Sequence, residues 1–172
     1  HQASRWIVRP LRLYDCCQES DGAVAVIVTT TERARDLRHA PVVIRAAAQG
    51  ASVDQQMMTS YYRDAIGDLP EMSFVAQQLY AMSGLGPRDF QTAVIYDHFT
   101  PFVLAQLEAF GFCGRGEGGP FVASGALSWP NGSLPTNTHG GSLSEAYIHG
   151  FNHILEAVRQ LRGDSTCQVE GA

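Results

Sequence analysis

Three short runs of apolar and β-branched residues constrain the fold of this chain more than any other feature. They span residues 23–29, 42–48 and 92–99. Their apolar residues are consecutive rather than alternate, which is typical of strands buried on both faces of a sheet. Helical patterns at 32–38, 70–84 and 100–110 alternate with these runs. This alternation predicts an α/β fold, with a mixed, largely parallel sheet and covering helices.

A longer helical pattern follows the Gly140-Gly141 pair and stops at Gly163. Its apolar positions, at three- and four-residue steps, are Leu143, Tyr147, Phe151, Leu155 and Val158. The charged positions between them, expected to face water, are Glu156, Arg159 and Arg162. The pattern predicts one amphipathic helix. The free N–H groups at the start of this helix lie beside two glycines and could bind an anion or a developing oxyanion. The alternative is that the glycine pair forms a turn with a purely structural role.

Composition excludes several classes of function. The 172 residues are 45% hydrophobic and 17% charged with a net charge of −5, which predicts a soluble globular core and argues against a nucleic-acid partner. No apolar stretch reaches the length of a membrane span, and no signal peptide is visible, so membrane association is not expected. The four cysteines lack zinc spacing and indicate free thiols of a cytoplasmic protein. All twelve cationic residues are arginine, so this chain supplies no Schiff-base lysine.

The sequence gives little support for three other kinds of site: a metal site, a phosphate-binding loop and a cysteine nucleophile. His149 and His153 are four residues apart, and Asp97, His98 and His139 could add metal ligands, but no HExxH or similar spacing supports a metal site. The glycine-rich loop 111–120 lacks the GK[ST] of a phosphate-binding loop, so it is either a turn that lines a site or a connector. Its cysteine is more typical of a small buried hydrophobe than of a nucleophile.

Residues 48–69 lack clear periodicity and are predicted to form a long loop. The apolar side chains in it could cover a substrate or contact a partner. These side chains are Met57, Met58, Tyr61 and Tyr62.

Four segments carry a resemblance to a known family: SDGAVAVIVTT, GFCGRGEGG, LPTNTHGGSLSEAYIHG and ILEAVRQLRG. They resemble the thiolase superfamily, and most closely its lipid-transfer-protein-like (sterol-carrier-protein-type) branch. The resemblance covers nearly the whole chain and implies a thiolase-like layered fold. Residues 1–39 would form the end of the first thiolase-like half. Residues 40–172 would form the second half, cut before its last strands, with the usual nucleophilic cysteines outside the chain.

Two motifs depart from the thiolase pattern. Thiolases carry Asn-Glu-Ala-Phe at the end of the third strand, where this chain has residues 96–99, YDHF. They carry Gly-His-Pro after the glycine pair, where it has residues 146–148, AYI. Tyrosines thus replace the Asn and His that hold a water and the thioester oxygen in thiolases. This is similar to the steroid side-chain aldolases of actinobacterial sterol degradation. It implies retro-aldol cleavage of a β-hydroxy steroid side-chain CoA thioester to a ring ketone and propionyl-CoA.

The resemblance also implies roles for individual residues. Tyr96 and Tyr147 are expected to form an acid/base pair that needs neither metal nor Schiff base. The residues expected to shape the thioester oxygen site are His139, Gly140 and Gly141. Those expected to tune or line the site are Asp97, His98 and Cys113. No cofactor is expected beyond the coenzyme A of the substrate.

The expected partners are a second copy of the chain, as a homodimer, and an OB-fold and zinc-ribbon protein of the acyl-CoA-associated type. Two alternatives remain open. One is an acyl-CoA thiolase that transfers acetyl or acyl groups, and the other is a non-catalytic lipid- or acyl-CoA-binding subunit.

Overall fold

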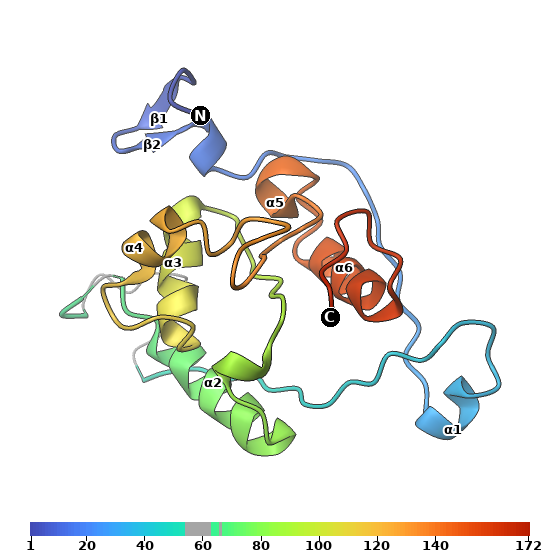
Figure 1. Cartoon of the computed structure of the whole chain (residues 1–172). Coiled ribbons are helices and arrows are strands. Elements are labelled where there is room, and N and C mark those ends of the chain that lie inside the picture. The colour runs from blue at the N-terminus through green and yellow to red at the C-terminus, as the bar shows by residue number, and fades with distance from the viewer. Residues whose placement is uncertain (54–62, 66) are drawn as a thin grey trace.

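The computed structural model describes residues 1–53, 63–65 and 67–172. Its helices are α1 (Thr31–Ala34), α2 (Pro70–Ser83), α3 (Thr100–Ala109), α4 (Gly118–Ala123), α5 (Gly141–Ser144) and α6 (Phe151–Arg162), with short 3-10 turns at Leu13–Asp15 and Pro87–Asp89. Strands β1 (Trp6–Val8) and β2 (Leu11–Arg12) form an antiparallel hairpin. The hairpin and α1 lie at the periphery, and α2 to α6 make up the body (Figure 1).

The helices predicted at 32–38, 70–84 and 100–110 correspond to α1, α2 and α3, although α1 is shorter than expected. Thr30 caps α1, since its side chain accepts a hydrogen bond from the Arg33 N–H. Proline opens α2 and stands in the first turn of α3, where its missing N–H costs nothing. Gly84 ends α2 in the left-handed conformation, with φ of 70°.

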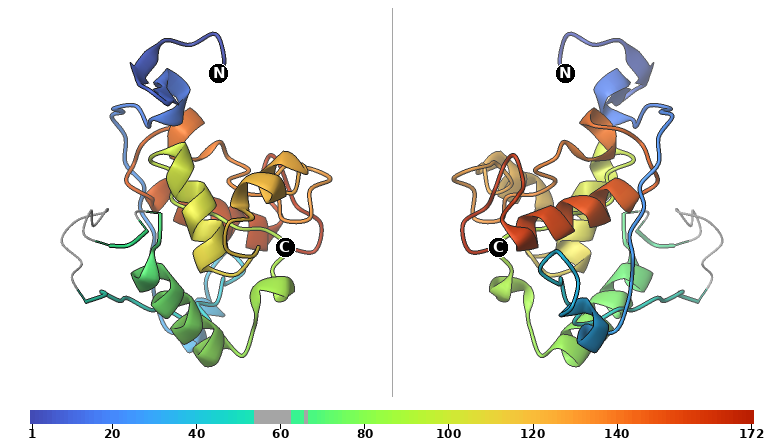
Figure 2. Two further views of the ribbon diagram at one scale, coloured as in Figure 1. Left: turned by 90° about the vertical axis from the view of Figure 1, so that its left-hand side faces the viewer. Right: turned by 90° about the vertical axis from the view of Figure 1, so that its right-hand side faces the viewer.

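The strands predicted at 23–29 and 42–48 are wrong for the described part of the chain, which pairs neither segment with a strand. Both are extended and run along the edge of the body (Figure 2). Ile27 is 92% exposed and Ile44 is 65% exposed. An extended segment becomes a strand only when a neighbour satisfies its N–H and C=O groups, and the described residues supply no such neighbour.

The predicted strand at 92–99 is reduced to two isolated bridges, Ala93 with Thr136 and Cys16 with Phe99. Asn137 extends the first bridge with its side chain. Its amide accepts from the Ile95 N–H at 2.7 Å and donates to the Ile95 carbonyl at 2.8 Å. Segments 92–97 and 134–138 therefore lie side by side.

A small hydrophobic core lies beside this pairing. Its buried members are Ile95, Leu107 and Leu134. Partly buried side chains from α3, α4 and the loops pack against them: Ala93, Val103, Phe112, Cys113, Phe121 and Leu127. The core thus fixes the segment that ends at Tyr96 against α3.

The single helix predicted after Gly141 is wrong in two respects. The chain leaves the helix after Ser144 and starts α6 only at Phe151. The predicted facing of α6 is also wrong in part. Arg159 and Arg162 are exposed as expected, but Glu156 is buried and Phe151 is 47% exposed. The other buried polar residues of α6 are Asn152, His153 and Gln160. The buried polar groups are tolerated because they hydrogen-bond to one another and to neighbouring loops.

The centre of the predicted loop 48–69, which includes Met57, Met58, Tyr61 and Tyr62, lies outside the described residues. None of the helices within the described ranges has the length and apolar character that crossing a bilayer requires.

Candidate active site

The structure brings together the two tyrosines that the sequence singles out. Tyr96 Oη and Tyr147 Oη are 2.7 Å apart, although 51 residues separate them in the chain. His149 joins them, with its Nδ1 at 2.9 Å from Tyr96 Oη. The result is a hydrogen-bonded row of phenol, phenol and imidazole, with Tyr96 in the middle.

The break between α5 and α6 makes this row possible. In a continuous helix, side chains two residues apart point roughly 200° away from each other. Here His149 has φ of 51° and Gly150 has φ of 88°, so the backbone turns sharply before α6. Tyr147 and His149 can then reach the same side chain. A histidine with positive φ costs about 1 kcal/mol, and such outliers persist where surrounding contacts hold them.

Asp97 holds the start of α5 and the inner face of α6 against this site. Its Oδ1 accepts from the Ser142 N–H at 2.7 Å and lies 3.0 Å from His153 Nε2, and its Oδ2 accepts more weakly from the Leu143 N–H at 3.4 Å. Burial opposes the charge on Asp97, but hydrogen bonds from His153 and Ser142 outweigh it and lower the pKa of the carboxyl. The N–H groups of Ser142 and Leu143, expected to be free for an anion, are therefore occupied by a carboxylate of the chain itself.

The residues predicted to shape a thioester oxygen site have other immediate neighbours. Gly141 has positive φ, and a Cβ on it would overlap the Asp97 carboxylate. The side chain of His139 is buried, with its ring edge-on to the His153 ring at 4.9 Å. Burial lowers the pKa of His139, so its ring is neutral near pH 7. The role of His139, Gly140 and Gly141 in binding a thioester stays a prediction.

His98 does lie at the pair. Its ring stacks on the Tyr96 ring, with centroids 4.8 Å apart and planes 24° apart. Burial lowers the pKa of His98, and neither ring nitrogen has a hydrogen-bond partner in the described part of the chain. Cys113, also predicted to line the site, packs instead against the hydrophobic core, where burial raises the pKa of its thiol.

The Tyr96 phenol keeps its proton at neutral pH. Burial raises its pKa well above the ordinary value of about 10, and the hydrogen bond with Tyr147 raises it further. The backbone around the phenol is fixed as well, since Gln106 Nε2 donates to the Tyr96 carbonyl at 2.7 Å. Tyr96 is thus a proton donor held in a defined place.

Sequence reasoning missed the contribution of residues 17–20. The Cys17 N–H donates to the His98 carbonyl at 2.8 Å, and Ser20 Oγ accepts from the Tyr147 N–H at 3.3 Å. It also treated His149 and His153 only as possible metal ligands. Among the residues that the structure describes, no group of three or more His, Cys, Asp or Glu side chains could hold a metal ion.

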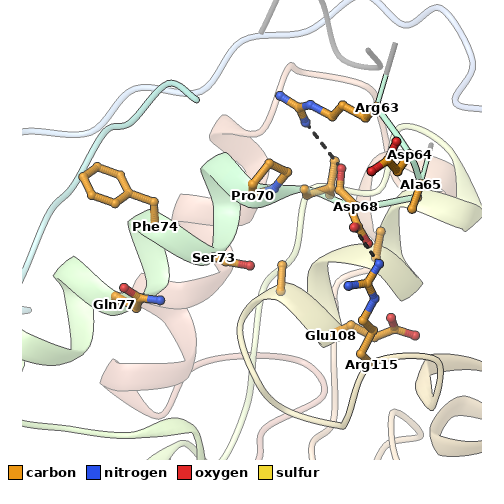
Figure 3. Close-up of a pocket in the computed structure, with 14 residues that line it drawn as sticks. Arg63, Asp64, Ala65, Asp68, Pro70, Ser73, Phe74, Gln77, Glu108 and Arg115 are labelled. Carbon is orange, nitrogen blue, oxygen red and sulfur yellow. Dashed lines mark hydrogen bonds and ion pairs between the residues drawn. The ribbon is translucent and has the colours of Figure 1, made fainter. Parts of the chain in front are cut away.

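A pocket of about 730 Å³ lies elsewhere, between α2, α3 and the loops before α2 and after α3 (Figure 3). Its two arginines are paired with acids, Arg63 with Glu71 at 3.0 Å and Arg115 with Asp68 at 2.6 Å. Neither Tyr96 nor Tyr147 is among the described residues that line it. The pocket and the tyrosine row are therefore separate features of the described residues.

Comparisons with known proteins agree with the resemblance in the sequence. Residues 50–172 match the family model described as thiolase C-terminal domain-like, and they fall within the part expected to be the second thiolase-like half. The chain is 64% identical, over 99% of its length, to a 17-hydroxy-3-oxo-4-pregnene-20-carboxyl-CoA lyase of Mycobacterium tuberculosis. It is 62% identical, over 98% of its length, to a steroid side-chain-cleaving aldolase of Thermomonospora curvata.

A solved structure, described as the Ltp2-ChsH2(DUF35) aldolase, matches 97% of the chain with a TM-score of 0.93 and 62% identity. The chain spans 44% of the M. tuberculosis relative, 43% of the T. curvata relative and 44% of the solved chain. The predicted thiolase-like α/β fold class is therefore confirmed, although the described residues form little of the sheet.

Proposed function

The chain belongs to the thiolase C-terminal domain-like family, and on this premise we propose that it carries the catalytic tyrosine pair of a carbon–carbon lyase. The lyase cleaves a β-hydroxy steroid side-chain CoA thioester by a retro-aldol reaction. The two relatives, 64% and 62% identical, whose names specify steroid side-chain cleavage and a steroid CoA lyase, support this substrate class. The products are a ring ketone and propionyl-CoA.

The observation that carries the proposal is the 2.7 Å contact between the hydroxyls of Tyr96 and Tyr147. A retro-aldol reaction needs a base for the hydroxyl proton and an acid for the enolate carbon. Two phenols in contact can pass one proton between them, so the pair can serve both steps.

The step balances without an oxidant or a reductant. One phenol oxygen accepts the proton of the β-hydroxyl, and the bond between the hydroxyl-bearing carbon and the α-carbon breaks. Its electron pair forms the enolate of the thioester, while the hydroxyl-bearing carbon becomes the ketone. A proton from the pair then reaches the α-carbon. Neither a metal nor a lysine takes part in this proposal.

Tyr96→Phe and Tyr147→Phe test the proposal in the intact protein, with the CoA thioester of 17-hydroxy-3-oxo-4-pregnene-20-carboxylate as substrate. We expect release of propionyl-CoA to fall by about 100-fold or more in each variant, the usual effect of losing an acid/base group. Tyr80→Phe is the matched control, because the Tyr80 hydroxyl donates to the Phe110 carbonyl and belongs to helix packing. Near-normal rates in both site variants would refute the assignment.

We further propose that the intact protein is a cytoplasmic homodimer that binds an OB-fold and zinc-ribbon partner. The partner is supported by the solved relative, whose description names ChsH2(DUF35) together with Ltp2. The homodimer is what the resemblance to thiolases implies. Light scattering of the protein alone and with the purified partner tests both associations. A monomer that gains no mass with the partner would contradict them.

A further inference from the structure

We propose that His149 is a positioning residue for this pair, which holds the Tyr96 hydroxyl and stores the proton that the two phenols exchange with the substrate. The inference rests on the proposed retro-aldol function and adds a third member to its site. Nothing in the sequence pattern alone pointed to this role.

The geometry of the Tyr96 oxygen carries the inference. It lies 2.7 Å from Tyr147 Oη and 2.9 Å from His149 Nδ1. A phenol has one proton and also accepts, so Tyr96 can donate to one neighbour while it accepts from the other. Tyr96 is therefore the middle of the row, and Tyr147 and His149 are its ends. Only an end can gain or lose a proton without breaking the row.

The exposed position of His149 allows this end of the row to exchange protons with solvent. The residue is exposed, while Tyr96 is partly buried. Its ring lies nearly parallel to the Tyr96 ring, with planes 10° apart and centroids 5.9 Å apart. It reaches this place through a left-handed backbone that glycine would adopt without strain. The contact of the His149 ring with the Tyr96 hydroxyl accounts for a histidine at a position that would otherwise favour glycine.

The proton moves along the row in both directions. As Tyr147 accepts the substrate's hydroxyl proton, its own proton passes to Tyr96, and that of Tyr96 passes to His149 Nδ1. After the carbon–carbon bond breaks, the row reverses, Tyr147 protonates the enolate carbon, and the imidazole is neutral again. Imidazoles change charge near neutral pH and phenols do not, so an imidazole avoids a phenolate intermediate.

An imidazole accepts a proton only in its neutral form, so the inference predicts a rate profile with an acid limb that depends on His149. The titratable groups that face it are Tyr96, Tyr147 and His98. Cys17 and Asp97 act on the same phenol, as both raise the pKa of Tyr96. Several titratable groups could therefore cause a fall in rate at low pH. A variant that changes His149 and none of the others is needed to assign that fall to His149.

The test compares wild type, His149→Gln and His149→Gly in the intact protein with the same steroid CoA thioester. Glutamine keeps a hydrogen-bonding group that does not titrate, and glycine suits the positive φ and leaves room for added imidazole. We expect kcat near pH 7 to fall 10- to 100-fold in both, with KM within about twofold. We also expect His149→Gln to lose the acid limb and added imidazole to restore part of the rate in His149→Gly. His39→Gln, at an exposed histidine outside the site, is the control and should behave as wild type.

A loss of rate that is equal at all pH values and not rescued by imidazole would overturn the inference, as would a wild-type rate in His149→Gly. An NMR titration of the His149 ring in wild type and Tyr96→Phe needs no substrate. The inference predicts that its midpoint moves when the Tyr96 hydroxyl is removed, and an unchanged midpoint would overturn it. If the midpoint moves but wild type does not cleave the thioester, the proposed function fails while the hydrogen-bonded row stands.

Discussion

At the scale of single residues, the site depends on how closely Asp97 approaches the start of α5. The approach is possible because Gly141 has no side chain, and a Cβ there would overlap the Asp97 carboxylate. The same glycine has φ of 65°, which glycine adopts without strain. Gly141 thus meets a steric and a backbone requirement at one position.

We expect Gly141→Ala to lower the free energy of unfolding by about 3 kcal/mol, because Asp97 must retreat and lose its hydrogen bond from the Ser142 N–H. Gly163→Ala is the matched control. Gly163 also has positive φ, at 75°, but open space surrounds it, so only the backbone strain of about 1 kcal/mol applies. Urea unfolding of both variants measures the difference. Equal losses would show that Asp97 does not depend on the glycine.

At the scale of elements, α6 shows what the sequence could and could not predict. Its end at Gly163 was predicted from the sequence, as were α2 and α3, but its start was not, because the helical pattern runs unbroken from Gly141. The buried face of α6 could not be predicted from the sequence, because the burial of Glu156 depends on hydrogen-bond donors that distant loops supply. The Glu156 carboxylate accepts from Thr138 Oγ1, from Ser165 Oγ at 2.7 Å and from Gln160 Nε2 at 2.9 Å. No local pattern contains these partners.

The candidate site divides in the same way. The tyrosines could be named from motif positions, because Tyr96 and Tyr147 stand where thiolases carry other polar groups. The position of His149 beside Tyr96 could not be predicted in this way, because it depends on a positive φ that breaks the apparent helix. The extended segments 23–29 and 42–48 carry the apolar run of a strand, and that run looks the same whether or not a neighbouring strand pairs with it.

We expect Glu156→Leu to destabilise the protein by about 3 kcal/mol, although leucine is the better helix former, because three donors would lose their acceptor. Arg159→Leu, one turn along at an exposed position of α6, is the control and should change stability by less than about 0.5 kcal/mol. Thermal or urea unfolding of the intact protein measures both. A stability in Glu156→Leu equal to that of Arg159→Leu would argue that the carboxylate faces water.

At the scale of the whole molecule, buried titratable groups make stability depend on pH. Burial lowers the pKa of His98 and of His139 in the folded state. Below about pH 6.5 the unfolded chain therefore binds protons that the folded chain does not, and the free energy of unfolding falls as the pH drops. The carboxyls of Asp97 and Glu156 have lowered pKa values, as their hydrogen bonds outweigh burial. Their contribution is present above about pH 4 and is lost as the pH falls through the folded-state values.

Urea unfolding between pH 7 and pH 3 should thus show two stages of lost stability. His98→Phe should flatten the first stage, between pH 7 and 5, because one of the two histidines no longer titrates. His39→Gln should leave that stage unchanged, since His39 is exposed. Stability that rises as the pH drops from 7 to 5 would contradict the neutral state of the buried rings.

The six residues between α5 and α6 form no regular structure, yet their number is constrained. They turn the chain so that Tyr147 and His149 both meet Tyr96. Inserting or deleting one residue there would rotate one ring away from the shared oxygen while leaving both helices able to form. This linker should therefore be far less tolerant of length changes than an ordinary loop, and homologues that vary in length here would need a different way to handle the proton.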